Sequence, residues 1–195
     1  PKPLLEVQGM PLIVRHIINL KLAGIEDIII NVSWLGDKII TALGDGSQYG
    51  VAIDYSTEES PLETAGGIRK AFAKLTDGIE PFIVLNGDIH CDFDFTHLTQ
   101  RAPDLKTKDC DAHLVLVSNP PQHTEGDFSL KDGHVCECSS DTVTFAGISL
   151  LSPRLILHYD QDEEKLGPLL RQAIAKERVT GEHFSGIWHD VGTPE

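Results

Sequence analysis

The sequence predicts an α/β fold with a mostly parallel central sheet flanked by helices, and three patterns in its first half carry that prediction. Segments with helical and with strand-like hydrophobic periodicity alternate in short units. The apolar runs within 27–32 and 82–85 are short and bounded by polar residues, as in strands that are covered on both faces. Turn-rich stretches such as 44–50 separate the units. Alternation of this kind is typical of a sheet with helices on both sides.

Each element of the first half follows from a local signal. Pro11 opens an amphipathic stretch that Gly24 closes, which predicts a helix with proline in its first turn. We expect 27–32 to be a strand buried on both faces, because its β-branched run is continuous. Gly66 and Gly67 fall inside a predicted helix, where each costs about 1 kcal/mol relative to alanine. The predicted order is helix 11–24, strand 27–32, helix 36–43, strand 51–56, helix 63–75, strand 82–85 and a short helix at 95–100.

The second half has strands joined by tight turns, with one further helix at about 164–176. We expect these strands to lie antiparallel on the same sheet. They are predicted at 111–118, 127–130, 134–138, 142–151, 178–184 and 187–192. No internal repeat or low-complexity linker divides the chain, so we expect residues 1–195 to form one domain. Its first and last three residues resemble interior segments of a longer protein.

Charge and composition narrow the class of function. Sixteen lysines and arginines against thirty aspartates and glutamates give a net charge of −14, which argues against nucleic acid or an anionic membrane as partner. No apolar run approaches the ~20 residues of a membrane-spanning helix, and no signal peptide opens the chain. The four cysteines lack CxxC spacing, which predicts reduced thiols and a cytoplasmic protein. The oligomeric state does not follow from the sequence.

Carboxylates at the ends of apolar segments indicate a metal site. Asp88 follows the run 82–85 directly, and ligands of open α/β sheets bind beyond the carboxyl ends of the strands. Magnesium ions take one or two carboxylates together with phosphate oxygens of a substrate. Asp88 is therefore interpreted as a Mg²⁺ ligand. Asp190, which follows another apolar piece, is the candidate for the second ligand.

These assignments have alternatives. Asn86-Gly87 could form the turn of a β-hairpin, although no clean returning strand follows it. Asp190 could instead be a turn or helix-capping residue. Asp92 and Asp94 are rival carboxylates, and they are better explained as turn and N-cap residues before the next helix.

Two further segments could contact a ligand. In 60–67 an extended Ser-Pro leads to glycines near a helix start, which lets the backbone approach a flat ligand closely. Glu63 in this segment could accept a hydrogen bond from a base, or it could be an acidic first-turn residue favoured by the helix dipole. Lys2 lies between two prolines and could present a fixed positive charge to phosphate; an exposed terminal lysine is the alternative.

A possible soft-metal site lies further along the chain. His134, Cys136 and Cys138 alternate along a predicted strand, so all three face one side. A zinc site needs four ligands, and no fourth ligand is apparent.

Five motifs, in this order and at these separations, resemble the sugar-1-phosphate nucleotidylyltransferases. They are PKPLLEVQGMPLI (1–13), ETAGG (63–67), VLNGD (84–88), TFAGISLL (144–151) and WHDVGT (188–193). The resemblance covers essentially the whole chain. It implies a Rossmann-like nucleotidyltransferase fold, an enzyme with Mg²⁺ as cofactor, and UTP and a sugar 1-phosphate as small-molecule substrates.

The resemblance also implies roles for individual residues. Asp88 and Asp190 match the two aspartates that hold Mg²⁺, and Lys2 matches a lysine that contacts the nucleotide phosphates. Substrate binding is implied for Glu63, Thr64, Gly66 and Gly67 on the pyrimidine side, for Asn86, and for Gly126, Thr144 and Gly147 on the sugar side.

Within the family, the stretches 31–68 and 181–193 are most similar to the members that act on N-acetylmuramate alpha-1-phosphate in peptidoglycan recycling. The implied reaction gives a UDP-sugar and pyrophosphate. Mannose-1-phosphate guanylyltransferases share the coarser pattern but usually carry Gly where Glu63 stands. They and glucose-1-phosphate thymidylyltransferases are alternative readings, and a non-catalytic sugar-nucleotide sensor is a second alternative.

Two motifs of the family have no counterpart in the sequence. Its glycine-rich loop, Gly-x-Gly-x-x-Arg after a first strand, would precede Lys2. The Glu-Lys-Pro triplet, whose lysine often meets the sugar phosphate, is not evident either. We therefore expect a domain that lacks its first strand, its glycine-rich loop and its C-terminal end, and a 195-residue chain that is impaired in catalysis by itself.

Overall fold

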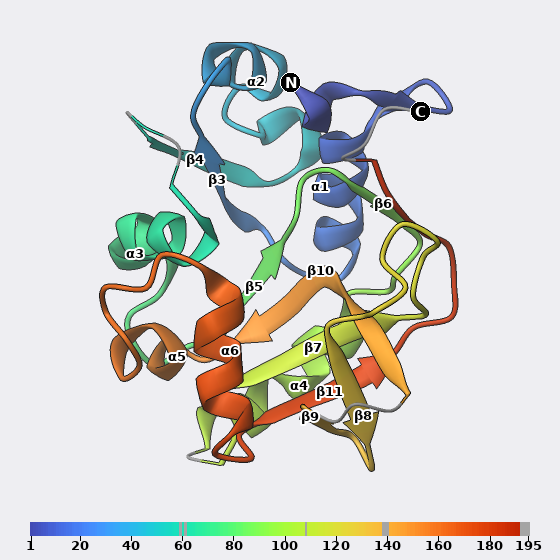
Figure 1. Ribbon diagram of the computed structural model, residues 1–195. Helices are drawn as coiled ribbons and strands as arrows, with labels where there is room; N and C mark the ends of the chain where they lie inside the picture. The colour runs from blue at the N-terminus through green and yellow to red at the C-terminus, as the bar shows by residue number, and fades with distance from the viewer. Residues whose placement is uncertain (59, 61, 108, 138–140, 192–195) are drawn as a thin grey trace.

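The computed structural model describes residues 1–58, 60, 62–107, 109–137 and 141–191, and it has the α/β architecture that the sequence predicted (Figure 1). The predicted helix at 36–43 is found with the same bounds, whereas the short helix α5 was not predicted. The helices are α1 (Leu12–Leu22), α2 (Gly36–Leu43), α3 (Thr64–Leu75), α4 (Thr96–Lys106), α5 (Pro153–Leu157) and α6 (Leu166–Ile174), with 3-10 turns η1 (Lys2–Leu4) and η2 (Ser47–Tyr49).

The described strands form one large sheet and three smaller pairs. The large sheet has the order β5-β10-β7-β11-β9-β8, and the pairs are β1-β2, β3-β4 and β6-β12. The strands are β1 (Glu6–Val7), β2 (Met10–Pro11), β3 (Asp27–Val32), β4 (Ala52–Thr57), β5 (Phe82–Leu85), β6 (Ile89–Cys91), β7 (Ala112–Val117), β8 (Phe128–Lys131), β9 (His134–Cys136), β10 (Thr142–Leu151), β11 (Val179–His183) and β12 (Trp188–Asp190).

The sheet is mixed, whereas the sequence predicted a mostly parallel one. Among the described strands, β3–β4 and β7–β11 are the parallel pairs. The long strand β10 lies between β5 and β7 and is antiparallel to both. Strand β10 comes later in the sequence than β5 and β7 but lies between them. An antiparallel strand of the second half therefore stands in the middle of the sheet.

A short hairpin before α1 was missed by the sequence reading. Gln8 and Gly9 form its two-residue turn with φ of 54° and 77°, the combination that a type I′ turn requires. The guanidinium of Arg15 donates to the Val7 carbonyl, which fixes the hairpin on α1. Pro11 ends this hairpin, so the helix begins one residue after the predicted proline position.

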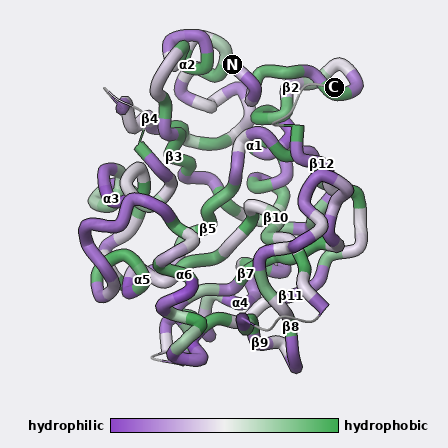
Figure 2. The backbone as a smooth tube through the Cα atoms, viewed as in Figure 1, coloured by the Kyte–Doolittle hydropathy of each residue, from purple (hydrophilic) through white to green (hydrophobic). Residues whose placement is uncertain are grey.

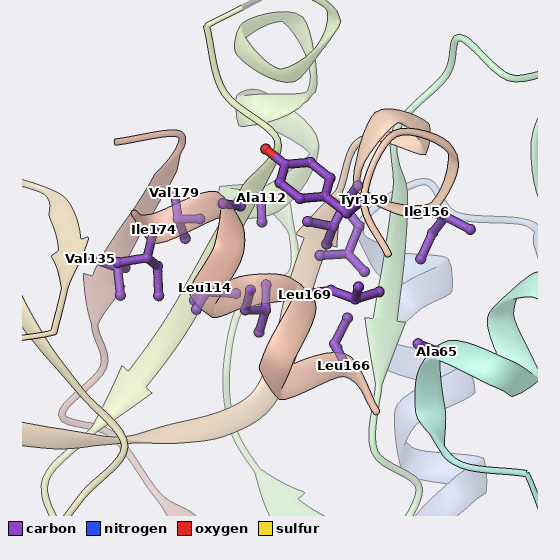
Figure 3. Packing of buried hydrophobic residues seen from close by; sticks show 14 of the residues in the cluster. Ala65, Ala112, Leu114, Val135, Ile156, Tyr159, Leu166, Leu169, Ile174 and Val179 are labelled. Atoms are coloured by element: carbon purple, nitrogen blue, oxygen red, sulfur yellow. The ribbon is translucent and has the colours of Figure 1, made fainter. Parts of the chain in front are cut away.

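Helices cover both faces of the large sheet. Alternate residues of β7 belong to different hydrophobic clusters: Leu114 and Leu116 pack toward α6, and Val115 and Val117 toward α4. Figure 3 shows α6 lying over the sheet with its apolar side chains directed at β7 and β11. Hydrophobic residues follow β5, β7 and β10 through the middle of the molecule (Figure 2). None of the helices in the described part is long and apolar enough to cross a membrane.

Strands β3 and β5 are less buried than the sequence predicted. Of β3 only Val32 is buried, and of β5 only Phe82, while the other apolar side chains of both strands are half-buried. The reason is a cavity of about 850 Å³ that both strands line. An apolar run predicts that a strand can be buried on both faces. It does not show whether another segment of the chain covers that strand, so the prediction of full burial for β3 and β5 was wrong.

Hydrogen bonds to the buried carboxylate of Asp111 connect the residue before β7 to the segment 154–159 and to Arg178 before β11. The Asp111 side chain is 2% exposed; it accepts hydrogen bonds from Arg178 Nε at 2.6 Å, Tyr159 Oη at 2.7 Å and Arg154 Nε at 3.0 Å. Burial opposes the charge of Asp111, but these bonds outweigh it and hold its pKa below the usual value. Burial, aided by the neighbouring carboxylate, raises the pKa of Tyr159 to about 12.

Candidate active site

Asp88 and Asp190 lie side by side although they are far apart in the sequence. Strand β12 runs antiparallel to β6, with Asp190 opposite Ile89. The Val191 N–H then donates to the Asp88 carbonyl at 2.9 Å. Asp190 is exposed and Asp88 is half-buried. The backbone therefore makes Asp88 and Asp190 diagonal neighbours across this strand pair.

These two carboxylates suit a hard divalent cation. Carboxylate oxygens are preferred ligands of Mg²⁺, which needs one or two of them when substrate phosphates and water supply the rest. The described residues contain no group of three or more histidine, cysteine and acidic side chains arranged to hold a metal. A site with two carboxylates would fit an ion that is shared with a phosphorylated substrate.

The predicted soft-metal strand gains no support from the described residues. His134 is exposed and Cys136 is half-buried on β9. Cys138 lies outside the described residues.

Asn86 and Gly147 are in direct contact where β5 ends against β10. The Asn86 N–H donates to the Gly147 carbonyl at 2.9 Å. Gly147 has a φ of +74°, and a Cβ there would lie 2.7 Å from Asn86 Nδ2. The register of β10 with β7 shifts around this glycine. A side chain at position 147 would therefore displace Asn86 from the end of β5.

The cavity between β3 and β5 has a polar end and an apolar body. Four of the predicted site residues line it, together with two that the sequence reading missed. The polar lining at that end is Asn31, Glu58, Glu63, Thr64, Asn86 and Asp88, and the polar residues His16, Glu26, Asp27 and Thr99 line the cavity elsewhere. Its remaining walls come mainly from apolar side chains of α1, β3, α3 and β5. Thr144 belongs instead to β10 and Gly126 lies beside Thr142 at the start of that strand; neither belongs to the described lining.

Asn31 and Glu58 are the missed residues, and both approach Gly67. A Cβ at Gly67 would lie 2.5 Å from Asn31 Nδ2 and 2.8 Å from Glu58 Oε1, whereas one at Gly66 would make ordinary contacts. Glu58 Oε2 also accepts from the Leu62 N–H at 2.9 Å. The rule that located Asp88 could have found Asn31, because Asn31 also lies near the end of an apolar strand.

Lys2, Asp92 and Asp94 all lie in the described part of the chain. Lys2 is exposed in η1, and the next residue, Pro3, lines the cavity and approaches Gly87. Asp92 Oδ1 accepts from the Ile187 N–H at 2.7 Å. Asp94 Oδ1 accepts from Thr96 at the start of α4. The Asp94 bonds agree with the predicted cap role, whereas the Asp92 bond joins the end of β6 to the segment before β12 and does not close a turn.

A neutral histidine lies in the cavity wall. His16 is 5% exposed, and its Nε2 lies 2.9 Å from the Ile89 carbonyl. Burial lowers the pKa of His16 to about 4, so the ring is neutral at pH 7. Nε2 must donate to that carbonyl, which makes Nδ1 an acceptor. This Nδ1 has no partner among the described residues.

The chain and its fold are similar to known proteins. Residues 1–128 match the nucleotidyl transferase family. The chain is 46% identical to N-acetylmuramate alpha-1-phosphate uridylyltransferase of Neisseria meningitidis serogroup B, over 99% of this chain and 84% of that protein. It is 30% identical to a mannose-1-phosphate guanyltransferase of Yarrowia lipolytica, over 100% of this chain and 56% of that protein.

A solved structure shows the same fold. The structure of HddC from Yersinia pseudotuberculosis is 25% identical, has a TM-score of 0.76 and covers 100% of this chain and 85% of its own. A second structure of that protein holds GMP-PN.

Proposed function

Because the chain belongs to the nucleotidyl transferase family, we propose that it joins UTP and N-acetylmuramate alpha-1-phosphate to give the UDP-sugar and pyrophosphate. The observation that carries this proposal is that Asp190 on β12 lies beside Asp88, which lines the polar end of the cavity. The 46% identity to the uridylyltransferase of N. meningitidis favours this sugar and this nucleotide.

The reaction depends on positioning and charge neutralisation. A phosphate oxygen of the sugar 1-phosphate attacks the α-phosphorus of UTP in line, and pyrophosphate leaves. Asp88 and Asp190 would hold Mg²⁺, which when bound supplies positive charge to the reacting phosphates. Lys2 adds a point charge on the nucleotide. The chain needs these local charges because its net charge of −14 repels both substrates.

The remaining site residues divide between the two substrates. Glu63 accepts from the N–H of the pyrimidine, and the backbone at Thr64, Gly66 and Gly67 admits its flat ring. Asn86 adjoins the metal ligand Asp88. On the sugar side we assign Gly126, Thr144 and Gly147.

Two helical glycines, Gly67 of α3 and Gly167 of α6, should respond differently to alanine. We expect Gly67→Ala to displace Asn31 and Glu58, because the new Cβ would lie within 3 Å of both side chains. The KM for UTP should then rise about tenfold, the equivalent of one lost hydrogen bond. Gly167→Ala is the matched control, since nothing lies within 4 Å of the new Cβ and alanine gains helix propensity. Equal KM values for UTP in both variants would show that the crowding at Gly67 is irrelevant to the nucleotide.

Substrate panels separate the proposal from its alternatives. A guanylyl- or thymidylyltransferase would prefer GTP with mannose 1-phosphate or dTTP with glucose 1-phosphate. A sugar-nucleotide sensor would bind a UDP-sugar in calorimetry without turning over any substrate pair. We also propose that the reaction takes place in the cytoplasm as part of peptidoglycan recycling, where the thiols of Cys91 and Cys110 would stay reduced.

We further propose that the domain is completed by a strand that lies between β3 and β5 and leads into the glycine-rich loop. In the described structure β3 pairs with β4 alone and β5 with β10 alone. The carbonyls of Glu26 and Val32 accept bonds from the β4 side. Because backbone groups alternate between the two sides of a strand, those of Asp27, Ile29 and Asn31 face away from β4.

The edge of β5 that faces β3 also has backbone groups that point away from the paired strand. The Asn86 N–H bonds to β10, so the backbone groups of Ile83 and Leu85 face away from β10 by the same alternation. These residues and the outward-facing ones of β3 line one cavity. Two open strand edges on one apolar cavity, with α1 and α3 in its walls, suit an extended apolar segment. Such a segment could also donate to Nδ1 of His16.

Hydrogen exchange tests this strand. In the full-length protein we expect the amides of Ile29, Asn31, Ile83 and Leu85 to exchange more slowly than in the 195-residue chain, because a strand between them protects them. The amides of Ile28 and Ile30 serve as internal controls, since they already face β4. The same exchange rates at the first four amides in both forms would contradict the added strand.

A further inference from the structure

One amide side chain after β7 joins three parts of the assigned sugar side. Asn119 Nδ2 donates to the carbonyl of Thr142 at 3.0 Å and to that of Thr124 at 3.1 Å. Its Oδ1 lies 2.9 Å from the Thr144 hydroxyl. A single residue thus connects the loop 120–127 with the start of β10.

The partners of Asn119 fix which way the amide points. Carbonyl oxygens can only accept, so the atom that faces Thr142 and Thr124 has to be Nδ2. Oδ1 then faces the Thr144 hydroxyl, which has to donate its proton. Thr144 is 6% exposed, so its hydroxyl does not rotate freely in water. With its proton committed to Asn119, this hydroxyl can offer only lone pairs to a further group.

Gly126 packs against the same amide. Its φ is +64°, and a Cβ there would lie 2.7 Å from Asn119 Oδ1. The next residue, Asp127, bonds to β10 twice: its N–H donates to the Val143 carbonyl, and its Oδ2 accepts from the Phe145 N–H, both at 2.8 Å. The loop and the strand are therefore one connected unit, with Asn119 inside it.

We propose that Asn119 is a positioning residue for the sugar 1-phosphate. It holds the Thr144 hydroxyl as a pure acceptor and fixes the Gly126 loop on β10, so this side of the site takes a sugar that donates a hydrogen bond from a hydroxyl or an amide. The proposal rests on the proposed function, in which Gly126 and Thr144 belong to the sugar side. Asn119 acts through these two residues.

Steady-state kinetics of the full-length enzyme test the proposal, because the two substrates report on different sides of the site. Asn119→Asp keeps the size of the side chain but sets a carboxylate against two carbonyl oxygens and cannot donate to them. The KM for the sugar 1-phosphate should rise about tenfold, the equivalent of one lost hydrogen bond. The KM for UTP should stay within about twofold, since Asn119 does not line the cavity.

A second variant and a control complete the design. Thr144→Val keeps the shape and removes the acceptor, so it should raise the same KM even if Asn119→Asp folds poorly. Ser118→Ala is the matched control, because its exposed hydroxyl meets only His183 in the described contacts, and both KM values should be unchanged. An unchanged sugar KM in Thr144→Val, or an equal rise of both KM values, would overturn the proposal. A wild-type enzyme that releases no pyrophosphate with any sugar 1-phosphate would overturn the proposed function instead.

Discussion

Asp88→Ala in the full-length protein should lower kcat for pyrophosphate release by about a hundredfold or more. Removal of residues that only support a metal ligand already costs 10- to 100-fold, so loss of a ligand itself should cost at least the upper end of that range. Asp190→Ala should have an effect of similar size, because Asp88 and Asp190 are neighbours where β6 meets β12 and would share one ion. The double variant should be little worse than either single one, since both act through one ion.

Asp94→Asn is the matched control for this prediction. It changes a carboxylate in the same acidic stretch, but that carboxylate caps α4 and does not line the cavity. Its kcat should equal that of the wild type. Magnesium titrations should show a weakened requirement for the ion only in the Asp88 and Asp190 variants. Full activity of Asp88→Ala would remove the metal site from the mechanism.

Asp111→Ala should have the largest effect on stability, about 3–5 kcal/mol in the free energy of unfolding. The change leaves the charges of Arg154 and Arg178 without the buried carboxylate that both contact. Urea unfolding followed by circular dichroism measures it. Because the pKa of Asp111 is depressed in the folded protein, the stabilisation is present above the ordinary aspartate pKa and is lost as the pH falls through the depressed folded value.

The control for Asp111→Ala is a surface ion pair. Asp54 contacts Lys74 at 2.9 Å with both side chains more than half exposed, and solvent screens such pairs. Asp54→Asn should leave the urea midpoint almost unchanged. Comparable losses in the two variants would mean that the network around Asp111 contributes no more than an ordinary surface pair.

The sequence predicted the bounds of individual helices and strands better than it predicted which strands lie next to each other. Local signals placed the helix 36–43 and the strand 82–85 with the bounds that are observed. The position of β10 between β5 and β7 had no local signal, because strand order depends on contacts between distant segments. For the same reason β3 and β5 were predicted to be fully buried, whereas most of their apolar side chains are half-buried.

Some residues of the candidate site could be predicted from local sequence signals, and others could not. Asp88 could be predicted because it directly follows an apolar strand, and Asn31 could have been found by the same rule. Glu58 and Asn119 could not, because their roles come from the bonds that they make to Leu62 and Thr142 across loops. Asp190 needed the family resemblance, since its pairing beside Asp88 joins segments from opposite ends of the chain.

The most direct test of the account is pyrophosphate release by the full-length protein with UTP, Mg²⁺ and N-acetylmuramate alpha-1-phosphate, measured beside GTP with mannose 1-phosphate and dTTP with glucose 1-phosphate. We expect turnover with the first pair that exceeds turnover with the other two, requires Mg²⁺ and disappears in Asp88→Ala. No pyrophosphate from the first pair, or the same rate with and without the Asp88 carboxylate, would contradict it.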